Sequence, residues 1–458
     1  MSDWDLETDV LVVGAGGCGL MAAYGAARKG VDVVLLEKNS RLGSNTELSS
    51  GSVAAAGTRF QRALDIDGTA EQMAEDVLRK NKGKANPEIV LTLCLKARDV
   101  VDLLVDEVGL QLNLNNDADR VGHSFRRMHN PPGRSGAPLV GAMHAALGRF
   151  PNFTFADHTP VKRLLEDDSG SVTGVMAGAT GDNRIKAGKI ILATNGFGAN
   201  KDMLRRYIPE MAEVEYIGSA NSTGEGILWG LELGAAVEHM TGYQGHGYIC
   251  PGYGSRLSPE IPILGGVMVN IHGDRFSRED QGYSELGGVL LKQPRSVGIM
   301  VFDQRIHDIL APTMHFREAI ESGALRRGET VDELSAALNI DANRLQTSID
   351  ECRAGALVGN DRFGRQLFGD PLRPPFYGAY ITGGLAHTQG GLKVDVNARV
   401  LRTDGSVIPN LYAGGGTSAG ISGDEPEGYL SGNGLLSALS SGLIAGEHAA
   451  STLRASRN

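Results

Sequence analysis

Short apolar runs separated by glycine turns mark the beginning of the chain. The run 9–13 has the length of a buried strand, and a glycine turn over 14–19 and an Ala-rich stretch over 20–29 follow it. A second apolar run over 31–36 ends directly before Glu37. Strand, glycine turn, helix and strand in this order predict a βαβ unit of a parallel sheet.

The rest of the pattern divides the chain into an interrupted domain and an insertion. Apolar residues at helical spacing predict helices over 69–109 and 136–150, and alternation over 153–191 predicts a small antiparallel meander. The middle third combines strand-like pieces and prolines with a predicted helical pair over 317–352, and strand, turn and helix return from residue 390. We therefore expect an α/β protein with one domain over 1–240 and 385–458, and a second domain inserted over 241–384.

The composition suggests that the protein binds a ligand, and it argues against several classes of protein. Glycine accounts for 63 of 458 residues, about twice its usual share, which suggests tight turns around a ligand. The net charge of −10 argues against nucleic-acid binding, and the four distant cysteines indicate neither disulfides nor a metal site. The acidic first residues carry no leader pattern, and no apolar run has membrane-spanning length. We expect a cytoplasmic protein without a membrane span or bound metal.

The first glycine turn has the spacing of a dinucleotide-binding fingerprint. Gly14 permits the tight turn, Gly16 lets backbone N–H groups approach a pyrophosphate, and Gly19 lets the helix pack onto the strand. Glu37 follows at the distance of about 20 residues that suits an acceptor for ribose hydroxyls. Glu37 followed by Lys38 favours FAD, and NAD remains the alternative.

Two further glycine-rich segments fit a long cofactor. The loop 43–52 places small hydroxyl and amide side chains after the ribose-binding position, and the segments 413–420 and 431–436 lie at the start of the last predicted helix. The N-terminus of a helix stabilises negative charge, such as that of a reduced flavin. Sites at both ends of the chain, with no evident attachment motif, predict non-covalent FAD.

These segments together resemble the flavoprotein family of soluble fumarate reductases, urocanate reductases and 3-ketosteroid dehydrogenases. The resemblance implies a Rossmann-like FAD-binding domain of the glutathione-reductase type with an inserted α+β capping domain, and a substrate held between cap and flavin. The segments that carry it are 12–16, 37–38, 43–46, 193–198, 223–226, 387–391 and 408–413. The cofactor-binding residues that it implies are Gly14, Gly16, Gly19, Glu37, Lys38, Ser44, Asn45, Thr46, Ser50, Gly51, Val161, Thr194, Asn195, Gly196, Gly415, Gly434, Leu435 and Leu436.

The positions that face the substrate depart from the fumarate reductase pattern. Where those enzymes place a proton-donating arginine after a Gly-x-Arg-Phe stretch, this chain has Tyr283, and where they place a carboxylate-binding arginine it has Tyr429, followed by Ser431. Tyrosines at both positions are similar to the 3-ketosteroid Δ4-(5α)-dehydrogenases and related cyclic ketone desaturases.

The chemistry of ketone desaturation explains why tyrosines would replace these arginines. Forming a C=C bond beside a ring ketone requires a base for the acidic α proton and an acceptor for the β hydride. We assign the base to Tyr429, a supporting proton relay to Ser431 and Tyr283, and the hydride acceptor to FAD. The substrate class is then a 3-ketosteroid or a smaller cyclohexanone, and the electron acceptor is unidentified.

Three further residues occupy positions that the resemblance connects with the substrate. His387 is expected to contact substrate or flavin, and His246 and Tyr248 are expected to bind the substrate. Two other functions remain open at this point. One is an ene reductase of the fumarate or urocanate type, and the other is a catalytically drifted flavin-binding partner in electron transfer.

Overall fold

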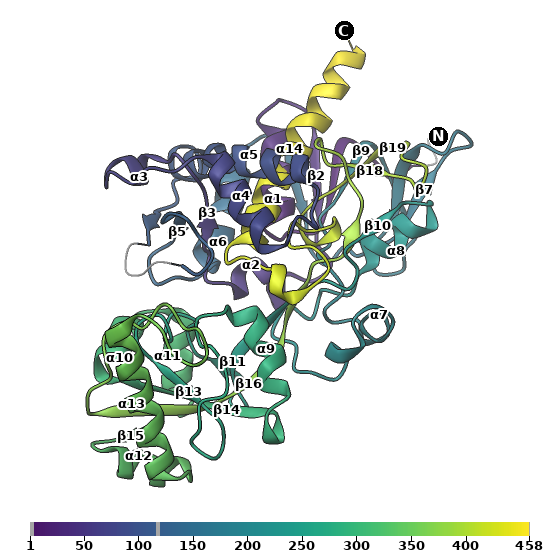
Figure 1. The fold of residues 1–458 in the computed structure, drawn as a ribbon. Helices are drawn as coiled ribbons and strands as arrows, with labels where there is room; N and C mark the ends of the chain where they lie inside the picture. Colours follow the sequence, from purple (N-terminus) through teal and green to yellow (C-terminus); the bar gives the residue numbers. More distant parts are fainter. Residues whose placement is uncertain (1–3, 116–119, 458) are drawn as a thin grey trace. The chain divides into compact units, whose positions relative to one another are not determined.

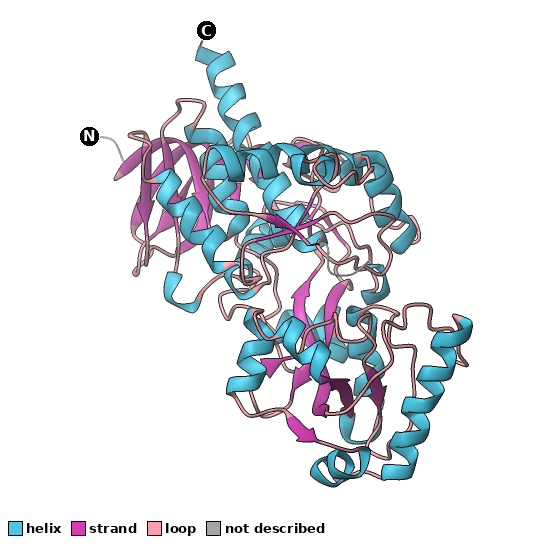
Figure 2. Ribbon diagram, turned by 90° about the vertical axis from the view of Figure 1, so that its left-hand side faces the viewer, coloured by secondary structure: helices cyan, strands magenta, loops and turns pink. Residues whose placement is uncertain are grey.

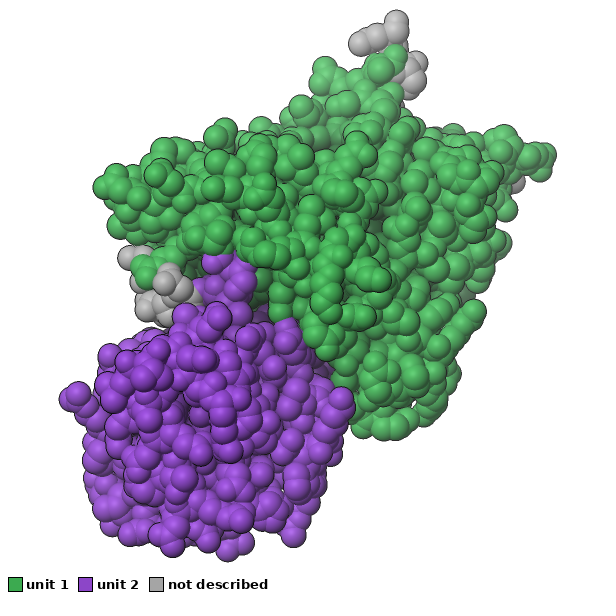
Figure 3. Space-filling view, in the orientation of Figure 1, with its two compact units in different colours: residues 1–115, 124–243, 387–458 green, residues 116–123, 244–386 purple. Residues whose placement is uncertain are grey.

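The computed structural model describes residues 4–115 and 120–457, and the chain forms two compact units. Unit 1 comprises residues 1–115, 124–243 and 387–458, and unit 2 comprises 116–123 and 244–386 (Figure 3). Helices and strands occur in both units (Figure 2), and each unit has a hydrophobic core of its own.

Unit 1 is built on a mainly parallel sheet, and this confirms the α/β fold class (Figure 1). The strand order is β18-β19-β9-β1-β2-β6; in addition, β8 pairs antiparallel with β9, and β7 pairs antiparallel with β8. Parallel strands bring their carboxyl ends to one edge, which is where ligands bind in such sheets. The strands are β1 (Leu6–Val13), β2 (Val33–Leu36), β6 (Phe153–Ala156), β7 (Val161–Glu166), β8 (Val172–Ala177), β9 (Asn183–Leu192), β18 (Arg399–Leu401) and β19 (Val407–Ala413).

The strand β6 corrects one sequence-based expectation. The alternation over 153–191 predicted that this segment belongs to the antiparallel meander, but β6 pairs in parallel with β2 at the far edge of the sheet. An edge strand is partly exposed to solvent, so its residues alternate like those of a meander strand, and the sequence pattern does not separate the two cases.

The first and last helices of unit 1 pack with their backbones nearly in contact. Every residue of α1 (Gly17–Ala27) is buried, and α14 (Asn433–Arg457) lies against it. A Cβ atom added at Gly442 would lie 2.3 Å from the carbonyl oxygen of Cys18, and one added at Gly446 would lie 2.1 Å from that of Ala22. Only glycine fits at these two positions of α14, so the two ends of the chain are joined through small residues.

Other helices and small sheets complete unit 1. Within the described part of the chain, every helix is too short or too polar to span a bilayer. The helices are α2 (Asn45–Leu48), α3 (Arg59–Arg62), α4 (Ala70–Lys80), α5 (Pro87–Asp106), α6 (Ala137–Leu147), α7 (Lys201–Tyr207) and α8 (Glu225–Glu232), and the strands are β3 (Val53–Ala54), β4 (Asn113–Leu114), β5 (Met128–Asn130), β10 (Val237–Glu238) and β17 (Gly391–Leu392).

Unit 2 is a twisted sheet covered by helices, in the order β12-β11-β16-β14-β13 with β15 beside β16. The expected helical pair over 317–352 is instead three helices interrupted by a short strand, because the polar turn around residues 322–330 breaks the helical spacing. The elements are β11 (Tyr243–Cys250), β12 (Ser255–Arg256), β13 (Val267–Val269), α9 (Tyr283–Leu291), β14 (Val297–Asp303), α10 (Gln304–Leu310), α11 (Met314–Glu321), β15 (Arg326–Gly328), α12 (Val331–Leu338), α13 (Ala342–Val358) and β16 (Phe376–Thr388).

Replacing Gly19 by alanine tests the close packing of α1 on the sheet. The new Cβ would lie 1.8 Å from the carbonyl oxygen of Gly14, so we expect Gly19→Ala to lower the free energy of unfolding by about 2 kcal/mol or more. Gly141 is the matched control, because it is a helical glycine of α6 with open space around it. Gly141→Ala should stabilise by up to about 1 kcal/mol. Equal denaturant midpoints for both variants would contradict this packing.

Candidate active site

The glycine turn between β1 and α1 forms an open cradle at the carboxyl edge of the sheet. Gly14 has a φ of +103°, and a Cβ added there would lie 2.4 Å from the carbonyl oxygen of Ala193. Gly16 precedes the helix and no side chain caps it, whereas the nearest atom to an added Cβ is the Cβ of Ser44 at 3.6 Å. The start of α1 is therefore open as a phosphate-binding turn requires, apart from the N–H of Gly17, which donates to Thr46 Oγ1.

Glu37 hydrogen-bonds to the glycine turn, and Lys38 binds the start of α8. Glu37 Oε2 accepts a hydrogen bond from the backbone N–H of Ala15 at 2.9 Å. Lys38 Nζ contacts Glu225 Oε1 at 2.6 Å and Thr223 Oγ1 at 2.7 Å, which ties the end of β2 to the start of α8. Burial raises the pKa of Glu225, but the hydrogen bonds from Lys38 and Thr223 and the charge of Lys38 together outweigh burial, so the pKa is lowered. Lys38 thus has an ion-pair partner in this unit.

The loop after Glu37 supports the turn through its short polar side chains. Thr46 Oγ1 accepts from the backbone N–H of Gly17 at 3.1 Å, and Asn45 Oδ1 accepts from that of Ser219 at 2.6 Å. Ser44 caps α2 by accepting from the backbone N–H of residue 47. These contacts place the predicted residues 44–46 beside the start of α1.

Asn130 was not identified from the sequence, and its hydrogen bonds show whether the residues present fit FAD. Its Nδ2 donates to the carbonyl oxygen of Ser50 at 3.0 Å and to Ser52 Oγ at 2.6 Å, beside the predicted Gly51. Its Oδ1 is buried and lacks a hydrogen-bond partner among the residues that the structure describes. A buried acceptor without a donor is costly, and both ring systems of FAD carry N–H groups. The residues present therefore fit FAD.

The remaining predicted cofactor residues lie in segments at the ends of neighbouring strands. Thr194 Oγ1 is 3.2 Å from Thr417 Oγ1, and Asn195, with φ +65°, donates to Ser222 Oγ at 2.8 Å. The backbone N–H of Gly415 donates to Ser441 Oγ at 2.9 Å. Gly196 and Gly415 follow β9 and β19, Val161 begins β7, and Leu435 and Leu436 lie buried in the first turn of α14.

Tyr429 and His387 converge on the N-terminus of α14. Their rings form an edge contact with centroids 5.6 Å apart and an interplanar angle of 78°. A Cβ added at Gly434 would lie 3.2 Å from His387 Nε2 and 3.4 Å from the hydroxyl oxygen of Tyr429. Ser431 is half-buried and lies two residues after Tyr429. The structure thus brings together two of the side chains to which the sequence assigned chemistry.

His387 is a neutral acceptor in this arrangement. Its Nδ1 lies 3.1 Å from the carbonyl oxygen of Thr388, which can only accept, so the proton resides on Nδ1 and Nε2 is free of a proton. The amide nitrogen of Gln389 lies 3.1 Å from Nδ1 and 3.4 Å from Nε2, and with the proton on Nδ1 it can donate only to Nε2. Burial lowers the pKa of His387 below its ordinary value of 6.5. Gln389 was missed in the sequence, although it follows His387 by two residues.

In unit 2, the structure groups Tyr283, His246 and Gln244. The hydroxyl oxygen of Tyr283 accepts from Gln244 Nε2 at 3.1 Å, and the Tyr283 and His246 ring centroids are 5.4 Å apart. His246 Nδ1 accepts from the backbone N–H of Tyr248 at 3.3 Å, so its other nitrogen carries the proton and can donate. Tyr248 is 1% exposed and belongs to the hydrophobic core of unit 2, and burial raises its pKa.

A half-buried cation near this group, Arg256, has no counterpart in the sequence-based prediction. Arg256 hydrogen-bonds to His315 Nε2, and His315 Nδ1 lies 3.3 Å from Glu318 Oε2. Burial lowers the pKa of Arg256 to about 10. Burial also lowers the pKa of His246, and the positive charge of Arg256 lowers it further. Within the described ranges there is no cluster of three or more metal-ligating side chains.

Comparisons with known proteins agree with this arrangement. A family model described as "FAD binding domain" matches residues 9–435. The chain is 29% identical over 452 residues to the probable fumarate reductase Ifc3 of Shewanella frigidimarina, covering 97% of this chain and 75% of that protein. It is 31% identical over 427 residues to the urocanate reductase of Eggerthella lenta, covering 89% and 69%.

A solved structure extends the comparison to the ketosteroid dehydrogenases. The 3-ketosteroid-Δ4-(5α)-dehydrogenase of Rhodococcus jostii RHA1, in complex with 4-androstene-3,17-dione, is similar with a TM-score of 0.77 and 25% identity. The match covers 98% of this chain and 97% of that one. The resemblance read from the sequence is confirmed at the level of the family.

The stability of the site should depend on pH through His129, which lies beside the loop 50–53. Its Nε2 contacts Thr58 Oγ1 at 2.9 Å, and burial lowers its pKa from 6.5 to about 4. Between these values the unfolded chain binds a proton that the folded chain does not, so stability falls as pH falls from 6.5 towards 4, by about 3 kcal/mol in all. Chemical denaturation at pH 7 and pH 5 measures this loss. His129→Gln should show a smaller loss than the wild type, and an unchanged pH dependence would contradict the assignment.

Proposed function

Because the chain belongs to the FAD binding domain family and is an FAD-dependent oxidoreductase of the kind that acts on CH–CH groups, we propose that it desaturates the α,β bond of a ring ketone. The observation that carries this proposal is the convergence of Tyr429 and His387 on Gly434. Tyr429 stands where the resemblance expects the carboxylate-binding arginine of a fumarate reductase, and its uncharged hydroxyl supports a ketone rather than a dicarboxylate.

The residues of unit 1 supply the proton chemistry of this reaction. Tyr429 removes the α proton of the ketone, and His387 Nε2 is an unprotonated nitrogen beside the tyrosine hydroxyl that can accept a proton in turn. Ser431 extends the relay. FAD, when bound, would supply the acceptor for the hydride of the β carbon. The residues 14–19, Glu37 and 44–46 would hold its adenosine and phosphate groups.

Unit 2 by itself carries hydrogen-bond donors that suit a ketone substrate. His246 is neutral and presents a ring N–H, which suits a ketone oxygen better than a charged carboxylate. Tyr283 supports the proton relay. The steroid dehydrogenase among the similar structures is in complex with a diketone, and this supports a 3-ketosteroid or smaller cyclohexanone as substrate class.

Ene reduction is the second candidate, and the names of the sequence relatives favour it. Both relatives described above are reductases of unsaturated acids. This chain, however, has Tyr283 and Tyr429 at the two positions where the family's fumarate reductases are expected to have arginines. This difference argues against ene reduction of an acid. Losing one charge-assisted hydrogen bond costs about 1.5–3 kcal/mol of binding.

Tyr429→Phe tests the proposed base. The variant keeps the ring and removes the hydroxyl, so we expect anaerobic flavin reduction by a reactive ketone to slow by about 10²-fold or more. Tyr412 provides a matched control, because its hydroxyl contacts a histidine, His448 Nδ1, at 3.0 Å elsewhere in unit 1. We expect the ketone to reduce the flavin of Tyr412→Phe at the wild-type rate. Similar rates for both variants would mean that Tyr429 contributes only packing.

The direction of the reaction separates the two candidates. We expect oxidised enzyme to be reduced by a 3-ketosteroid or a cyclohexanone derivative, and reduced enzyme to be oxidised slowly by fumarate and urocanate. Anaerobic spectroscopy of the flavin with each compound measures both directions. Rapid oxidation by fumarate that saturates at low concentration would overturn the dehydrogenase assignment.

A further inference from the structure

The hydrogen bond between Gln244 and Tyr283 has a defined polarity. Gln244 Nε2 lies 3.1 Å from the phenol oxygen, and Gln244 is 9% exposed. An amide NH₂ group only donates, so the oxygen of Tyr283 is the acceptor in this contact. A phenol has one proton, and that proton must point to a different partner.

Close packing of β11 against α9 fixes the backbone at both ends of this bond. The backbone N–H of Gly245 donates to Ser284 Oγ at 3.0 Å, next to the Gln244 bond. A Cβ added at Gly247 would lie 2.9 Å from the Cβ of Leu286, and one added at Gly287 would lie 3.2 Å from the backbone nitrogen of His246. β11 and α9 therefore pack so closely that the backbone positions carrying Gln244 and Tyr283 are fixed.

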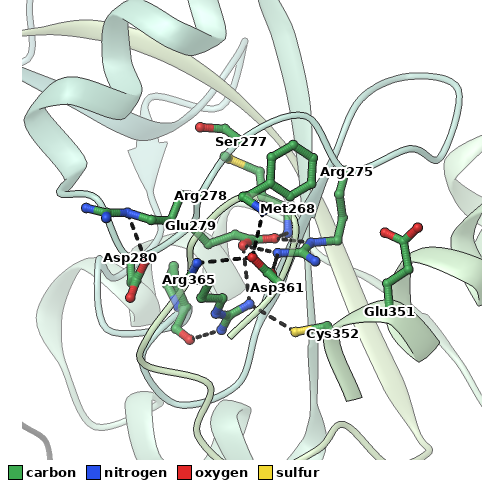
Figure 4. Close-up of polar contacts among 12 residues, drawn as sticks. Met268, Arg275, Ser277, Arg278, Glu279, Asp280, Glu351, Cys352, Asp361 and Arg365 are labelled. Carbon is green, nitrogen blue, oxygen red and sulfur yellow. Dashed lines mark hydrogen bonds and ion pairs between the residues drawn. The ribbon is translucent and has the colours of Figure 1, made fainter. Parts of the chain in front are cut away.

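Buried ion pairs anchor the loop that leads to Tyr283 (Figure 4). Arg275 donates to both carboxylate oxygens of Glu279 at 2.8 and 2.7 Å, and the side chains of both residues are fully buried. Asp280 Oδ2 accepts from two backbone N–H groups of the loop 366–367 at 2.8 and 2.9 Å. These charges are paired within unit 2 and hold the chain directly before α9.

We infer that Gln244 is a positioning residue that makes Tyr283 a hydrogen-bond donor in the reaction. Its amide group occupies one side of the phenol oxygen and directs the hydroxyl proton away from β11. Tyr283 then presents its proton to the group on the other side of the phenol oxygen. The consequence for the reaction rests on the proposed function, but the polarity of the bond is a property of unit 2 alone.

Gln244→Glu reverses this polarity with little change of shape. The carboxylate can only accept, so the hydroxyl of Tyr283 would donate to it. With ¹³C at tyrosine Cζ, the substrate-free holoenzyme gives one NMR signal per tyrosine, and Tyr283→Phe identifies the signal of interest. We expect that signal to move downfield in Gln244→Glu, because donation to a carboxylate adds phenolate character, and to move less in Gln244→Met. An unmoved signal in both variants would overturn the inference.

A second glutamine–tyrosine pair in unit 2 is the matched control. Tyr377 donates its hydroxyl proton to Gln304 Oε1 at 2.7 Å, so this glutamine is already the acceptor. Gln304→Glu keeps an acceptor in place. We expect the signal of Tyr283 to be unchanged in this variant, whereas a shift as large as that in Gln244→Glu would show that the effect is not specific to the Gln244 bond.

Kinetics then connect the polarity with the reaction. With a ketone that reduces the flavin, we expect Gln244→Glu to slow reduction by about tenfold or more. The same change in a Tyr283→Phe background should have no further effect, because Gln244 acts through Tyr283. Additive losses would overturn the positioning role. If no ketone reduces the flavin, the proposed function fails, while the NMR result still decides the polarity.

Discussion

The near contact of backbones around α1 is the constraint on which the rest of unit 1 depends. Gly14 and Gly19 allow the turn to close on itself and on β9, and Gly442 and Gly446 allow α14 to lie against α1. No side chain fits into these contacts, so the positions of turn and helix are set by the backbone. The glycine turn from one end of the chain and the start of α14 from the other consequently belong to one compact unit. Tyr429 and His387 lie in that same unit.

The chemistry of the candidate site rests on uncharged groups. Burial keeps His387 and His246 neutral near pH 7, and the aromatic partners of these histidines are tyrosines. Several cations of the chain are paired elsewhere, such as Arg275 with Glu279. A site of this kind can orient a carbonyl oxygen and move a proton.

The sequence predicted the features that follow from local pattern. The βαβ unit with its glycine turn has a strict spacing, and the family followed from segments along the whole chain. The sequence did not predict the parallel pairing of Phe153–Ala156, because an edge strand alternates like a meander strand. It also missed Asn130 and Gln244, whose hydrogen bonds link residues 80 and 39 positions apart. Such contacts exist only after folding, and a glutamine or asparagine carries no pattern of its own.

The central claim is that a ring ketone loses a hydride from its β carbon to the flavin while Tyr429 takes the α proton. Anaerobic stopped-flow reduction of the enzyme with one ketone, either unlabelled or deuterated at the β carbon, tests it most directly. The account predicts that both ketones reduce the flavin and that the deuterated one does so more slowly. No reduction by either ketone, or equal rates with reduction limited by chemistry, would contradict it.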